Sequence, residues 1–71
     1  MDDRRVFKVV FYYLVDRGEI EITVKCKDIR KVSDNCLLVD NVEFLIEDKF
    51  SRVGKIYELV NGKYEYAKGL Q

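Results

Sequence analysis

The sequence predicts an all-β fold, a small antiparallel meander of six to seven short strands with at most one short helical turn. Residues 6–15 are almost all β-branched or aromatic, which favours strands. Residues 19–27 alternate between apolar and polar with period two, as in a strand with one buried face. Turn signals recur at short intervals, at residues 16–18, 33–35, 40–41 and 61–62. Such spacing favours a small barrel of the SH3-like or Sm-like kind, or alternatively a bent sheet completed by a second subunit. This likeness of fold carries no function.

The first two arms, 6–15 and 19–27, should form a hairpin closed near Gly18. We expect Val15 to face Ile20, because a slip of one residue would turn the apolar side of the second arm toward water. This register gathers eight side chains on one face: Val9, Phe11, Tyr13, Val15, Ile20, Ile22, Val24 and Cys26.

The other face of the first arm is also apolar, with Val10, Tyr12 and Leu14 pointing away from the main core. Two interpretations remain open at this point. A later segment covers this side, or the side is an exposed stripe that contacts a partner or a twin subunit.

After Cys26 the period breaks, because Ile29 and Val32 are three residues apart. A β-bulge near residues 27–28 is favoured over a helical turn at 28–32, since a bulge lets a small sheet bend. Strands are expected at 36–39 and 42–47. Their pairing should set Val39 against Val42 and Leu37 against Phe44, on one core face with Ile46.

Residues 47–52 are polar apart from Phe50 and indicate a loop or a single helical turn, and the next stretch is ambiguous. Apolar residues at 50, 53, 56, 57 and 60 have helical spacing, but Gly54 and a β-branched run oppose a helix. Asn61-Gly62 is a strong hairpin signal, so we expect strands at 55–60 and 63–67. Tyr57 then faces Tyr66, Leu59 faces Tyr64, and Glu58 meets Glu65 as a like-charge pair.

The chain of 71 residues should be one domain, 1–71, with frayed ends at 1–5 and 68–71. A chain this short is marginally stable alone, and oligomerisation is one remedy. Its longest apolar run, residues 9–15, is far shorter than a membrane span, so we expect a cytoplasmic protein without membrane contact.

Composition excludes much chemistry. The sequence has no histidine and two cysteines, too few ligands for a structural zinc site. Cys26 is expected to point inward and Cys36 outward, so no disulfide is expected. Without histidine there is no Ser-His or Cys-His pair, and the many carboxylates are explained by a solvated face. We expect no enzymatic activity, no cofactor and no metal.

The favoured hypothesis is a small non-catalytic protein-binding module, an adaptor, inhibitor or assembly subunit that also self-associates as a homo-oligomer. Small neutral proteins of this kind are common among accessory proteins of phages and mobile elements. The contact would be a sheet face or strand edge around Val10, Tyr12 and Leu14. The alternative, less favoured at zero net charge, is single-stranded nucleic acid binding by a tyrosine and lysine surface. Its candidates are Lys55, Tyr57, Lys63, Tyr64 and Tyr66.

Overall fold

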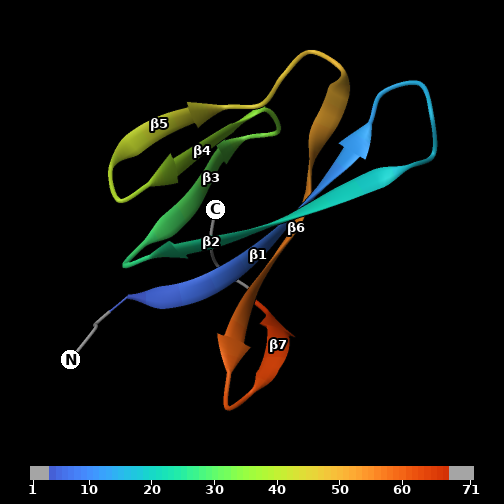
Figure 1. The fold of residues 1–71 in the computed structure, drawn as a ribbon. Helices are drawn as coiled ribbons and strands as arrows, with labels where there is room; N and C mark the ends of the chain where they lie inside the picture. The colour runs from blue at the N-terminus through green and yellow to red at the C-terminus, as the bar shows by residue number, and fades with distance from the viewer. Residues whose placement is uncertain (1–3, 68–71) are drawn as a thin grey trace.

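The computed structural model describes residues 4–67, whose seven strands form two antiparallel sheets (Figure 1). No helix occurs within this range, which confirms the all-β prediction. One sheet has four strands in the order β2-β1-β6-β7, and the other has three in the order β3-β4-β5. The strands are β1 (Arg5–Tyr13), β2 (Glu19–Cys26), β3 (Ile29–Ser33), β4 (Cys36–Val39), β5 (Val42–Leu45), β6 (Phe50–Val60) and β7 (Lys63–Tyr66).

The chain passes from one sheet to the other at residues 27–28, between β2 and β3. The helical turn considered at 28–32 is wrong, because β3 covers most of this stretch. The favoured β-bulge is also not observed: the chain changes direction here, but by ending one strand and starting another in the second sheet. Both backbone N–H groups of the break, those of Lys27 and Asp28, donate to Asp40 Oδ1 at 2.9 Å. Asp40 lies in the turn between β4 and β5, so one carboxylate ties the bend to the neighbouring hairpin.

Two hairpins have the turns that their sequences predict. Asp40 and Asn41 have φ angles of 50° and 67°, and Asn61 and Gly62 have 52° and 82°. Two successive positive φ values are typical of a type I′ turn, whose twist matches that of the flanking strands. The predicted pairings across both turns, including the like-charge pair of Glu58 with Glu65, are confirmed.

Residues 50–60 form a continuous strand, so the helical alternative is wrong for this stretch and β6 begins within the expected polar loop. The register of β6 against β1 shifts between Val10 and Phe11 and again between Tyr12 and Tyr13. Such shifts mark β-bulges, which let the sheet curve. β6 makes β1 a central strand, since β1 pairs with β2 on one side and β6 on the other.

The predicted register of the first hairpin is wrong, although its faces are right. Ile20 pairs with Phe11 and not with Val15, a shift of four residues that keeps every side chain on its expected side. β1 ends at Tyr13, whose N–H donates to the Gly18 carbonyl at 3.1 Å across a wide loop. The N–H of Leu14 donates to the carbonyl of Lys49 at 2.9 Å, on the side of β6. The hairpin pairing with β2 therefore stops before Leu14.

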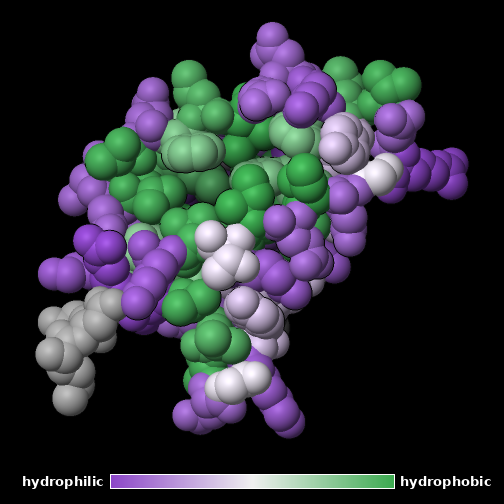
Figure 2. All heavy atoms as spheres, viewed as in Figure 1, coloured by the Kyte–Doolittle hydropathy of each residue, from purple (hydrophilic) through white to green (hydrophobic). Residues whose placement is uncertain are grey.

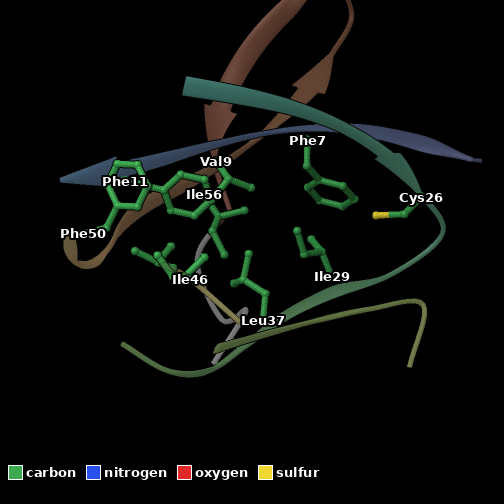
Figure 3. Close-up of a cluster of buried hydrophobic side chains, with 10 residues drawn as sticks. Phe7, Val9, Phe11, Cys26, Ile29, Leu37, Ile46, Phe50 and Ile56 are labelled. Carbon is green, nitrogen blue, oxygen red and sulfur yellow. The ribbon is translucent and has the colours of Figure 1, made fainter. Parts of the chain in front are cut away.

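The hydrophobic core lies between the two sheets (Figure 3). Phe7 and Val9 point from β1 toward Ile29 and Leu37 on the opposite sheet, and all four are nearly inaccessible to solvent. Phe50 closes one end, with its ring centroid 5.7 Å from that of Phe11. The buried cluster comprises Phe7, Val9, Phe11, Cys26, Ile29, Leu37, Ile46, Phe50, Val53 and Ile56.

Both cysteines are buried and neither forms a disulfide. The inward position of Cys26 is confirmed. Cys36 pairs with Leu45 and so lies on the face opposite Leu37, as expected, but it is buried there and not exposed. Cys36 follows the turn between β3 and β4, and the backbone of this turn is hydrogen-bonded to residues 46 and 53. The carbonyl of Asp34 accepts from the Val53 N–H at 2.7 Å, and that of Asn35 accepts from the Ile46 N–H at 2.8 Å. These contacts cover the start of β4.

The frayed ends expected at 1–5 and 68–71 lie largely outside the described residues. Within them, Arg5 is the first residue of β1, so fraying is not observed there. In the described part of the chain, no helix has the length and apolar character needed to cross a membrane.

Candidate functional site

The most distinctive surface feature is an apolar cleft between the two sheets, of about 80 Å³. β1 and β4 form its floor, while β2 and β5 form its two sides. Figure 2 shows apolar side chains gathered over β5 and β2 on this face. Every lining residue is apolar: Val9, Phe11, Ile22, Val24, Leu37, Val39 and Phe44. The cleft therefore offers contact area without any polar group that would orient a small polar ligand.

Both sides of the cleft are edge strands, which explains why it is open. β2 ends the four-stranded sheet and β5 ends the three-stranded sheet. Ile22 on β2 is 43% exposed and Phe44 on β5 is 53% exposed, although both lie on the core side of their strands. The expectation that Val42 and Phe44 are core residues is wrong for this reason: no further strand lies beyond β5 in residues 4–67 to cover them.

The predicted contact stripe of Val10, Tyr12 and Leu14 does not form one exposed surface. Val10 is buried, because β1 is central and its neighbours in register are Glu21 on β2 and Lys55 on β6. Tyr12 is half-buried, and a Cβ at Gly54 would overlap its ring. Leu14 lies beyond the end of β1 and is 63% exposed.

The outer face of β1, β6 and β7 carries a second group of side chains, named here the tyrosine face: Lys8 on β1, and Tyr57, Leu59, Tyr64 and Tyr66 on β6 and β7. The ammonium of Lys8 lies 5.0 Å from the ring centroid of Tyr57 and 4.7 Å from that of Tyr64, within cation–π range. Tyr57 and Tyr66 meet edge to face at 6.0 Å. Lys8 also contacts Glu21 at 3.8 Å, so its charge is partly compensated.

The five nucleic-acid candidates are therefore only partly brought together. Lys55 alternates with Tyr57 along β6 and shares its face, and Tyr64 and Tyr66 lie opposite that strand on the same side. Lys63 pairs with Val60, which places it on the other face of the hairpin. Lys8 was missed by sequence reasoning, because it reaches these tyrosines only through the pairing of β1 with β6.

The titratable groups supply little chemistry. Burial raises the pKa of the Cys26 thiol, and the nearby carboxylates of Asp40 and Asp28 raise it further. A buried thiol that holds its proton is a poor nucleophile and a poor metal ligand. Among residues 4–67, no three His, Cys, Asp or Glu side chains are gathered closely enough to hold a metal ion.

No family model matches the sequence, and comparisons with curated proteins and with solved structures gave no match.

Sequence reasoning identified both sides of the cleft as apolar but assigned them to the core. The signal that could have separated them is strand order. The apolar face of a strand is buried only where the opposite sheet extends far enough to cover it. The alternation that places Ile20 and Ile22 on one face does not show how far the opposite sheet extends. Ile20 is 39% exposed, at the margin of the cleft.

Proposed function

We propose that this chain is a non-catalytic protein-binding module that takes up an extended protein segment along the apolar cleft. The observation that carries the proposal is the cleft itself, lined only by apolar side chains and flanked by the edge strand β2. An extended segment that adds to a sheet edge gains main-chain hydrogen bonds, while alternate side chains enter neighbouring pockets. The partner is thus a strand-forming segment with apolar residues at every second position.

The size of the cleft supports a side chain rather than a small-molecule ligand as its occupant. Small-molecule sites enclose roughly 300–1,000 Å³ and contain a few oriented polar groups. This cleft has about 80 Å³ and no polar lining residue. It suits the tip of an apolar side chain that is held in place by backbone pairing outside the cleft.

Phe44 and Ile22 are the residues expected to contribute most to affinity. Both line the cleft, and about half of the Phe44 side chain remains exposed at 53%. Aromatic anchors in desolvated pockets dominate many protein interfaces. Covering Phe44 and Ile22 together would remove the largest apolar side chains on the two sides of the cleft from water.

The test is selection of peptides from a random displayed library against the full chain, followed by affinity measurement for the selected peptides. Phe44→Glu should weaken binding at least tenfold, because it places a charge in the apolar cleft. Leu45→Glu is the matched control, since Leu45 is 69% exposed on the opposite face of the same strand. Peptides that bind the Phe44→Glu chain as tightly as the wild type, or a library that yields no binder, would contradict the proposal.

A second candidate, binding of single-stranded nucleic acid, is favoured by the tyrosine face alone. Tyr64 and Tyr66 are 40% and 53% exposed, and exposed rings beside a lysine can stack bases. The charge balance of thirteen basic and thirteen acidic residues, and the contact of Lys8 with Glu21, weigh against it. A titration with a fluorescent single-stranded oligonucleotide decides the matter. Binding at low salt that weakens with added salt and with Tyr64→Ala would support it, and no binding at low salt would end it.

A further inference from the structure

The free edge of β2 is the least protected part of the backbone. β2 pairs with β1 on one side only, through an unbroken register over eight residues from Glu19 to Cys26. Natural edge strands are commonly protected by proline, by a bulge or by very short length. This strand has none of these features: the sequence contains no proline and the pairing contains no bulge. Its remaining protection is its charged side chains, whose order is informative.

The charges of β2 and of Lys27, the first residue after it, are arranged symmetrically with opposite signs around Thr23. Glu19 and Glu21 precede Thr23, while Lys25 within β2 and Lys27 just beyond its end follow it at the same distances. If a second copy pairs antiparallel about Thr23, Glu21 faces Lys25 of that copy and Glu19 faces Lys27. All four charged pairs across the seam are then attractive. The two pairs of Glu21 with Lys25 lie directly across paired strands, where opposite charges are stabilising. The two pairs of Glu19 with Lys27 lie at the ends of the seam, because Lys27 follows β2 and its N–H donates to Asp40.

Other registers and orientations lose this match. Centring the pair on Glu21 or on Lys25 sets like charges directly against each other. Centring it on Ile22 gives two attractive pairs, of Glu19 with Lys25, and sets Arg17 against Lys27. Centring it on Val24 gives two attractive pairs, of Glu21 with Lys27. A parallel pairing in register would place every charge beside its own copy. The pattern therefore selects one register and one orientation, and it matches this strand to itself.

The apolar side of the same strand is consistent with that pairing. A two-fold axis perpendicular to the sheet leaves the core side of both copies on one side of the joined sheet. In the register about Thr23, Ile22 faces Val24 of the second copy and Ile20 faces Cys26. The exposed fractions of Ile20 and Ile22, 39% and 43%, would be covered at the seam next to the cleft.

We propose that the strand-forming partner of β2 is a second copy of this chain, paired antiparallel about Thr23 to give a continuous eight-stranded sheet. This inference rests on the proposed function, because it names the occupant of the same edge. The product is a symmetric dimer with strand order β7-β6-β1-β2-β2-β1-β6-β7, and the three-stranded sheets of both copies cover one side of it.

Light scattering after size exclusion, over a range of protein concentrations, measures the mass of the full chain. The wild type should run as a dimer. Glu21→Lys and Lys25→Glu should each weaken dimerisation at least tenfold, because each sets two like-charge pairs across the seam. Mixing the two variants should restore a dimer, since every pair in the mixed dimer is again attractive. Glu65→Lys on the edge strand β7 is the matched control and should leave the dimer unchanged.

Restoration by mixing separates this contact from a simple loss of folding, because both variant chains must be folded to pair. A wild-type chain that stays monomeric at every concentration would overturn the self-pairing. So would a dimer that both charge reversals leave intact. Because a second copy would occupy the β2 edge, the peptide selection is also run on the Glu21→Lys chain, whose edge is then free of that copy. Failure of the dimer and failure of the cleft as a protein-binding site are therefore distinguishable.

Discussion

Asp40 and Asp28 are joined by a reciprocal pair of hydrogen bonds. Oδ1 of Asp40 accepts from the N–H of Asp28, and the N–H of Asp40 donates to the carbonyl of Asp28, both at 2.9 Å. The same Oδ1 accepts from the N–H of Lys27. Asp40 also has a left-handed backbone, with φ at 50°, which aspartate tolerates better than most residues. One side chain thus serves both the hairpin turn and the junction between the two sheets.

Asp40→Gly should lower the free energy of unfolding by about 1–2 kcal/mol, because glycine keeps the left-handed backbone but leaves two N–H groups without their acceptor. Asp40→Asn, which retains an acceptor oxygen without the charge, should lower it less. Urea unfolding measures both. Asn41→Gly at the next turn position is the control and should be near neutral. Equal losses for the glycine and asparagine variants at residue 40 would argue against a role for the carboxylate.

Gly54 is expected to be irreplaceable because the ring of Tyr12 occupies the space of its missing side chain. Gly54→Ala should destabilise the fold by about 1–3 kcal/mol, the usual range for overpacking. In a Tyr12→Ala background the same change should be much smaller, and a double-mutant cycle measures the difference. Gly62→Ala meets no atom within 4 Å and is strained only by its φ of +82°, so its effect should not depend on Tyr12. Additive effects of Gly54→Ala and Tyr12→Ala would contradict the contact.

The Cys26 thiol should make stability depend on pH in alkaline solution. Its pKa is raised by burial and by Asp40 and Asp28, so the folded chain holds this proton more tightly than the unfolded chain. The contribution is complete below the pKa of the unfolded thiol, about 8.5, and is lost as the pH rises through the folded pKa.

Cys26→Ala should be less stable than the wild type near neutral pH because it leaves a cavity, and the gap should narrow above about pH 9. Urea unfolding of both chains in a pH series measures this gap. Val24→Ala, a truncation without a titrating group, should keep a constant gap over the same range. A constant gap for Cys26→Ala as well would show that the thiol does not titrate differently on folding.

The positive charge of Arg5 should offset part of the electrostatic repulsion between the carboxylates of Glu58 and Glu65. The Nε of Arg5 lies 3.2 Å from Glu58 Oε2, and Glu58 pairs directly with Glu65. Glu65→Gln should stabilise the fold by a few tenths of a kcal/mol, and by more when Arg5→Gln is also present. Thermal unfolding at low salt and at about 1 M salt measures both effects, which should shrink at high salt. A stabilisation independent of Arg5 would contradict this role.

The sequence predicted the parts of the fold that depend on neighbouring residues. The Asn41 and Gly62 turns and the pairings beside them followed from local backbone preference. The sequence could not predict the pairing of Ile20 with Phe11 in place of Val15. A register shift by an even number of residues leaves every side chain on the same face, so the apolar pattern does not distinguish the two registers. The loop after Tyr13 also lacks a strong two-residue turn signal that would fix the register.

The candidate site was harder to predict, because exposure depends on which strands become edges. The sequence left open whether Val10 is covered by a later segment or exposed, and the pairing of β6 with β1 decides that it is buried. Phe44 was expected to be buried, yet β5 ends its sheet and leaves it half-exposed. Both outcomes depend on strand order, which arises from contacts between distant parts of the chain.

The central position of β1 has a consequence for how the chain folds. Phe7 pairs with Val24 nearby in the chain and with Glu58 near its other end. The early hairpin can therefore form before β6 pairs with the second edge of β1. Its apolar side is buried only when the three-stranded sheet packs over it. Folding dominated by such distant pairings takes milliseconds to seconds, far slower than for helical bundles. The transition should be a single cooperative step, timed by the arrival of β6 at the flank of β1.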